Sequence, residues 1–173
     1  MPIPPDAAAL PPETWAEVRA RDHVMRYRRS GAGPAVLLLC SADGPEPLWP
    51  ELLQLLATRS RLIVPEVPAA GADVASWLTD FLEGLGTARV AVVAAAPFCL
   101  PALELALLDR DQVARLVLVP GGGAEETGLG GVLTTATRPA PVPLLMVRRG
   151  LPAAEAMPLV MHFLGAGDAT APG

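Results

Sequence analysis

The run of residues 89–95, which is apolar throughout after its first residue, is followed within a few residues by a segment with the spacing of a helix, residues 100–110. An unbroken apolar run of this length is typical of a strand buried on both faces, as strands are in a parallel sheet. The other such runs, separated by helical patterns, are residues 35–40, 61–64, 115–119 and 142–147. Because strands alternate with helices, we expect right-handed βαβ crossovers and an α/β fold: a mainly parallel twisted sheet with helices on both faces.

Two local patterns stand out around this framework. Residues 17–20 and 23–27 alternate in polarity on either side of a short polar turn, which predicts an N-terminal β-hairpin. The strongest helical pattern is residues 74–85, where the apolar side chains share one face. A last helix is predicted at 153–164, whereas residues 121–140 form only a weak helix candidate.

The chain length fits one folding unit. Residues 1–13 are rich in Pro and Ala and predict a disordered arm, and residues 167–173 predict a disordered tail. We therefore expect residues 14–166 to form a single domain, a size at which one core buries most of the chain's surface.

The composition restricts the partners. A net charge of −5 with only 18% charged residues argues against nucleic acid. Hydrophobic residues make up 51% of the chain. This predicts either a sheet covered on both faces or apolar surface left for a hydrophobic small-molecule ligand or for a second subunit in a homodimer. Without an apolar stretch of membrane-spanning length or a leader-like segment, the sequence predicts a cytoplasmic protein with no membrane contact. All 13 basic residues are Arg, which we interpret as the bias of a GC-rich bacterial gene, such as that of an actinomycete.

Metal and cofactor chemistry is not predicted. The two cysteines, Cys40 and Cys99, and the two histidines are too far apart in sequence to match a metal-ligand pattern. The Gly-rich segment at 121–123 lacks the residues that follow a phosphate-binding loop. We expect no bound metal and no cofactor.

The framework resembles a known family. Residues 27–34 ahead of the run at 36–40 look like the entry to the third strand of an α/β-hydrolase. Residues 49–53 and 61–68 are similar to the first helix and fourth strand of that family. The resemblance covers about residues 15–150 and implies a short hydrolase-like fold without a cap domain. It places the family's nucleophile in the turn after residues 89–95, where hydrolases carry a G-x-S-x-G motif.

The functional motifs of that family are replaced here. The nucleophile position holds Ala96, and the next residue, Pro97, has no backbone N–H to stabilise an oxyanion. Glu66 stands where an Asp usually follows the fourth strand. His162 fits either a terminal helix, which we favour, or the loop that would deliver a catalytic histidine. The resemblance therefore implies a member that has lost its catalytic triad.

Ligands on an open parallel sheet bind beyond the carboxyl ends of its strands. The residues expected to line that crevice are Cys40, Ser41, Trp49, Ala96, Phe98 and Cys99. Asp43 and Glu66 are the candidate catalytic acids, although Asp43 could equally belong to a turn and Glu66 could cap a loop. Cys99 is open to two interpretations: a thiolate nucleophile or a buried structural cysteine.

Two functional classes follow from these substitutions. The first is a non-hydrolytic catalyst that folds an apolar substrate for cyclisation or rearrangement, in bacterial specialised metabolism of polyketide-like compounds. The alternative is a non-catalytic pseudoenzyme that acts as a binding or accessory subunit. An acid such as Asp43 or Glu66 directed into an enclosed pocket would favour the catalyst.

Overall fold

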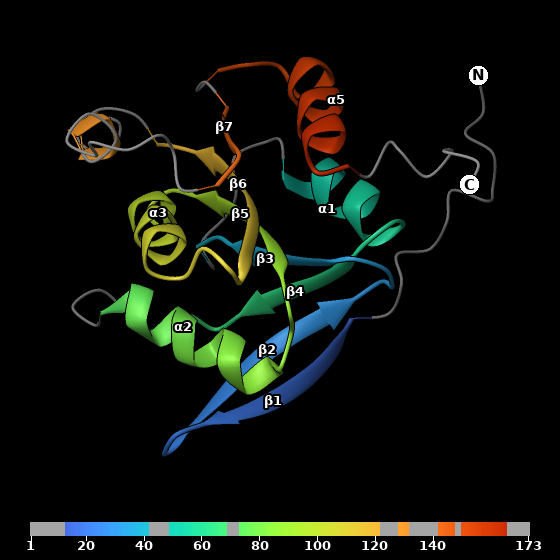
Figure 1. The fold of residues 1–173 in the computed structure, drawn as a ribbon. Helices are drawn as coiled ribbons and strands as arrows, with labels where there is room; N and C mark the ends of the chain where they lie inside the picture. Colours follow the sequence, from blue (N-terminus) through green and yellow to red (C-terminus); the bar gives the residue numbers. More distant parts are fainter. Residues whose placement is uncertain are drawn as a thin grey trace.

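The computed structural model describes residues 13–41, 49–68, 73–121, 128–131, 142–147 and 150–165, in which strands and helices alternate as predicted (Figure 1). The strands are β1 (Thr14–Ala20), β2 (His23–Ser30), β3 (Ala35–Leu39), β4 (Arg61–Pro65), β5 (Val90–Ala95), β6 (Val113–Val119) and β7 (Leu144–Met146). The helices are α1 (Trp49–Ala57), α2 (Val74–Leu85), α3 (Cys99–Leu108) and α5 (Ala153–Phe163).

The strands form one mixed sheet in the order β1-β2-β4-β3-β5-β6-β7. The pairs from β4 to β7 are parallel, whereas β1 pairs with β2, and β2 with β4, in antiparallel fashion. The prediction of a mainly parallel sheet is confirmed, with the hairpin added at one edge.

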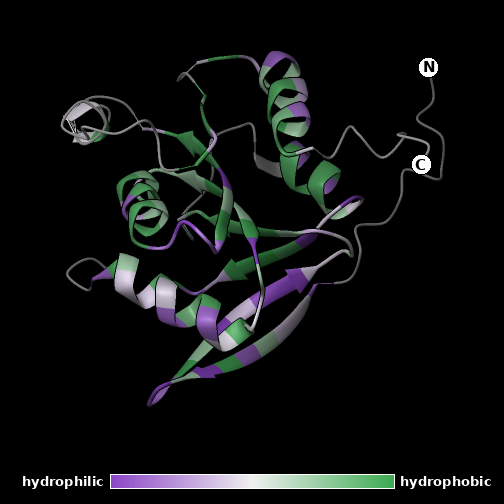
Figure 2. Ribbon diagram, in the orientation of Figure 1, coloured by the Kyte–Doolittle hydropathy of each residue, from purple (hydrophilic) through white to green (hydrophobic). Residues whose placement is uncertain are grey.

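Helices cover both faces of the sheet, as expected. In Figure 1, α1 and α5 lie on one side of the strands and α2 and α3 on the other. All residues of β3 are buried, and they alternate between two cores: Leu37 and Leu39 pack in the α2–α3 core, Val36 and Leu38 in the α1–α5 core. Figure 2 shows the inner strands as largely hydrophobic and the hairpin as mixed. The inner strands are buried on both faces, whereas the hairpin strands are buried on one, and this explains the contrast.

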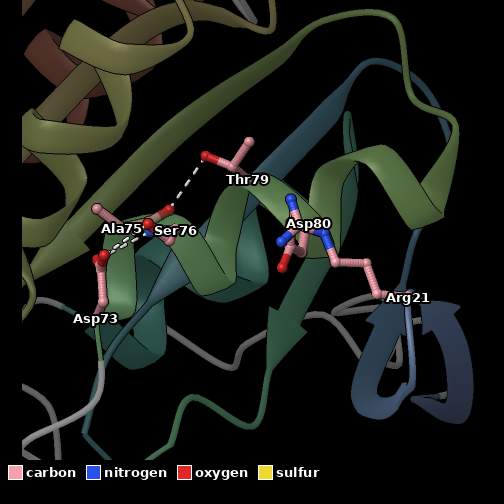
Figure 3. A network of polar contacts seen from close by, with 6 residues as sticks. All are labelled: Arg21, Asp73, Ala75, Ser76, Thr79 and Asp80. Atoms are coloured by element: carbon pink, nitrogen blue, oxygen red, sulfur yellow. Dashed lines mark hydrogen bonds and ion pairs between the residues drawn. The ribbon is translucent and has the colours of Figure 1, made fainter.

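The hairpin turns tightly and one of its faces lies under α2. Arg21 has a φ of +53°, the left-handed conformation required of the first central residue in a primed two-residue turn. Val18 and Met25 are buried in the α2–α3 core. Arg21 also forms an ion pair with Asp80 of α2 at 2.9 Å (Figure 3). The hairpin is thereby fixed against the helix that follows β4.

The start of α2 is set by Asp73. Its carboxylate accepts hydrogen bonds from the backbone N–H of Ser76 at 3.1 Å and from the Ser76 hydroxyl at 2.6 Å (Figure 3). These two bonds lower the pKa of the Asp73 carboxyl below its ordinary value. The helix ends at Gly86, which has a left-handed φ of +62°. The pattern predicted for residues 74–85 is confirmed.

Some predicted boundaries differ or lie outside the described residues. The last strand is shorter than its apolar run, with β7 limited to Leu144–Met146. Within the weak helix candidate at 121–140, helix is described at residues 128–131. The predicted arm at 1–13, except Glu13, and the tail at 167–173 fall outside the described residues. No helix among those described combines the length and apolarity needed to cross a membrane.

Candidate functional site

A cleft of about 910 Å³ lies at the carboxyl ends of β3, β4 and β5. The chain leaves β3 toward α1 on one face and leaves β5 toward α3 on the other. Adjacent parallel strands whose connections leave on opposite faces create a crevice, and this is where α/β sheets bind ligands. The cleft is lined by Trp15, Arg28, Cys40, Ser41, Val64, Pro65, Glu66, Val67, Pro68, Val74, Pro97, Phe98 and Pro101.

Sheet register brings the hairpin to this cleft. Trp15 pairs with Arg28 across β1 and β2, and Arg28 pairs with Val64 across β2 and β4. Directly opposite residues share a face of the sheet, so these three side chains form a row that leads to the end of β4. Trp15 is 54% exposed, a large apolar group open to solvent. It therefore provides an aromatic wall at the hairpin side of the cleft.

The charged groups of the cleft are partly compensated. The guanidinium carbons of Arg26 and Arg28 lie 4.8 and 5.9 Å from the centroid of the Trp15 ring. The Glu66 carboxylate is 3.9 Å from Arg26, and Glu13 is 3.3 Å from Arg28. Exposed ion pairs at these distances contribute little to stability. The charged groups of the cleft are therefore held only weakly by these ion pairs.

Cys40 sits at the boundary between cleft and core. It follows β3, is half-buried, and packs against the α1–α5 core. Burial raises the pKa of the Cys40 thiol, and the positive charge of Arg28 partly offsets this. A thiol with a raised pKa carries less thiolate at neutral pH and is a weaker nucleophile.

The backbone N–H groups of the turn between β5 and α3 already donate hydrogen bonds to other backbone carbonyls. The N–H of Ala96 donates to the carbonyl of Val119 at 3.2 Å, and the N–H of Phe98 donates to the carbonyl of Ala95 at 2.8 Å. Pro97, which lies between them, has no N–H. The backbone of residues 96–98 therefore directs no uncommitted amide into the cleft.

The structure brings together part of the predicted site. Cys40, Ser41, Glu66 and Phe98 line the cleft. The side chain of Glu66 is 52% exposed, so this acid lies at the rim and not in an enclosed pocket. Asp43 lies outside the described residues, and for Trp49 only the backbone is described, within α1.

Two predicted lining residues are corrected. Cys99 is completely buried in the α2–α3 core, and its Sγ donates to the carbonyl of Ala94 at 3.4 Å. It does not line the cleft, because the first turn of α3 directs this side chain toward the sheet. Ala96 is half-buried but does not line the cleft either, and its neighbours Pro97 and Phe98 take that place.

His162 lies in the last turn of α5, the interpretation that the sequence favoured. It is exposed and is not part of the cleft lining. Among the residues that the structure describes, no cluster of His, Cys, Asp or Glu could hold a metal ion.

Sequence reasoning missed the contribution of the hairpin to the site. Trp15 and Arg28 line the cleft, although neither was a candidate. Alternation along the hairpin could have placed them on one face. Only the antiparallel pairing of β2 with β4 carries that face to the strand ends.

No known protein-family profile matches the chain, and no curated protein does. Solved structures do match it. An epoxide hydrolase from Vigna radiata is 18% identical with a TM-score of 0.52, over 62% of this chain and 38% of that one. A haloalkane dehalogenase from Bradyrhizobium elkani USDA94 is 21% identical with a TM-score of 0.52, over 62% of this chain and 42% of that one.

A candidate lipase from Acinetobacter baumannii AYE is 20% identical with a TM-score of 0.54, over 64% of this chain and 42% of that one. These structures all have the α/β-hydrolase fold, and the present chain has the same fold. The chain spans about two fifths of the length of the solved structures it matches.

Proposed function

We propose that this chain binds an apolar small molecule in the cleft at the strand ends and does not hydrolyse it. The cleft volume of about 910 Å³ lies within the range usual for small-molecule sites. Its walls are mostly apolar, with Trp15 and Phe98 as aromatic groups and few charged side chains. Such a lining favours an apolar body fixed by one or two polar contacts.

The turn after β5 is the observation that carries the proposal. At the hydrolase nucleophile position stands Ala96, which has no nucleophilic atom. The amide expected of the next residue is absent in Pro97, and the amide of Phe98 is bonded to Ala95. Acyl transfer needs both a nucleophile and oxyanion donors. This arrangement supports a hydrolase scaffold without a catalytic triad.

A second candidate is a cyclisation or rearrangement catalyst of polyketide-like metabolism in a bacterial cytoplasm. Glu66 favours it, as the one carboxylate among the described residues of the lining. Its exposure at the rim favours simple binding instead, because an acid catalyst benefits from a water-excluded site. Formation of a cyclised product from a synthetic poly-β-keto thioester, lost in Glu66→Gln, would select the catalyst.

Nile red, a neutral apolar dye whose emission rises in apolar surroundings, tests the binding site. We expect saturable binding to the purified chain with one dye per cleft. Ser41→Phe places a bulky ring in the cleft and should weaken binding at least about tenfold, roughly 1.4 kcal/mol.

Leu159→Phe is the matched control, because Leu159 is exposed on α5, outside the cleft lining. This variant should bind the dye as the unchanged chain does. The proposal is contradicted if the dye does not bind, or if Ser41→Phe, folded normally by circular dichroism, binds it with unchanged affinity.

A further inference from the structure

The cleft contains one cation among its described lining residues, Arg28. Its side chain is half-buried beside Trp15, and its ionic partner among the described residues, Glu13, approaches a single nitrogen at 3.3 Å. A guanidinium has five N–H donors in a planar fork. Most of the donor capacity of Arg28 is therefore open to a group that enters the cleft.

The charge of Arg28 acts at the floor of the cleft as well as at its edge. It lowers the pKa of the Cys40 thiol against the larger effect of burial. Cys40 lies at the end of β3, and Arg28 comes from the hairpin. A ligand between these two elements would be within reach of the guanidinium.

The N-terminus of α3 contributes apolar side chains to the cleft, so Arg28 has no competitor there for an anionic group. Phe98 is its N-cap residue and offers no side-chain acceptor, and Phe98 and Pro101 both line the cleft. Neither residue offers a free backbone donor, because Pro101 has no N–H and the N–H of Phe98 is bonded to the carbonyl of Ala95. The only acid of the described lining, Glu66, is 3.9 Å from Arg26 and is partly neutralised by it.

We propose that the ligand of this cleft is an apolar carboxylate whose anionic group pairs with Arg28, while its apolar body lies between Trp15 and Phe98. This inference rests on the proposed binding function and specifies its ligand class. A carboxylate can meet the guanidinium fork through two parallel hydrogen bonds. Glu13 would compete for the same group, so it weakens the binding of such a ligand.

The test compares cis-parinaric acid, a fluorescent apolar carboxylate, with its uncharged methyl ester. At neutral pH and low salt the acid should bind at least about tenfold more tightly than the ester, as expected for a charge-assisted hydrogen bond. Arg28→Met should reduce this preference to about one. Glu13→Gln should increase it, because the competing carboxylate is removed.

Arg29→Met is the matched control, since Arg29 is the neighbouring position on the opposite face of β2 and does not line the cleft. The Arg29→Met variant should prefer the acid over the ester to the same extent as the unchanged chain. Equal binding of both probes to the unchanged chain overturns the inference and leaves the proposed function standing. If neither probe binds, the proposed function fails with it. A preference that persists in Arg28→Met also overturns the inference.

Discussion

At the scale of single residues, the proposed absence of hydrolysis depends on the turn at 96–98. Val119 and Ala95 accept the hydrogen bonds of the two amides that the turn has, and Pro97 supplies none. Removing one oxyanion donor from a hydrolase costs roughly 3–4 kcal/mol of transition-state stabilisation. A substitution at Ala96 alone therefore cannot supply the missing oxyanion donor, because Pro97 still has no N–H.

We expect no release of p-nitrophenol from short-chain p-nitrophenyl esters above the buffer rate. Ala96→Ser should be equally inactive, because a serine at this position still lacks the oxyanion donors and a base. The absorbance of p-nitrophenolate measures the hydrolysis rate of the unchanged chain and of Ala96→Ser. Cys40→Ala and Cys99→Ala serve as controls: activity in the unchanged chain that either one abolishes would identify a thiol enzyme and contradict the expectation.

At the scale of elements, the close contact of α2 with β1 fixes the hairpin. A Cβ added at Gly84 would lie 2.8 Å from the Val18 Cγ2 atom and 3.0 Å from the Arg19 carbonyl oxygen. The second of these atoms belongs to backbone in the sheet and cannot rotate away. The strand passes so near that glycine fits at position 84 better than a larger residue, although glycine is otherwise unfavourable inside a helix.

Gly84→Ala should destabilise the protein by about 1–3 kcal/mol, despite the gain in helix propensity of about 1 kcal/mol. Urea unfolding followed by circular dichroism measures the change. Glu83→Ala, at the exposed neighbouring position of α2, should alter stability by no more than about 0.5 kcal/mol. A stabilised Gly84→Ala variant would show that the hairpin can shift away from the helix without cost.

At the scale of the whole molecule, apolar surface remains uncovered. The large exposed apolar side chains of the described residues are Trp15, Val24, Leu108, Met146 and Leu159. We expect a homodimer that covers the cleft, with about 1,200–2,000 Å² buried in total, as is usual for a specific interface.

Light scattering coupled to size exclusion measures the mass directly. A dimer at micromolar concentration is the expected result, and added apolar ligand should not dissociate it. A monomer across the micromolar range, without ligand, would contradict the expectation. The cleft would then be open to solvent in the monomer.

The sequence by itself determined the order of the elements. Unbroken apolar runs predicted the buried strands, alternation predicted the hairpin, and one apolar face predicted α2. The sequence also placed Ala96 and Pro97 in the critical turn. These inferences succeed because apolar periodicity records which faces of a local segment are buried, and because a residue type fixes its own chemistry.

Only the tertiary structure decided which of these residues meet. Trp15 and Arg28 line the cleft because β2 pairs with β4, a long-range pairing that local periodicity does not encode. Phe98 lines the cleft, whereas its neighbour Cys99 faces the core. The rotation of α3 about its own axis relative to the sheet decides this difference. Burial and site membership depend on the packing of one element against another, so they are settled only when the elements come together.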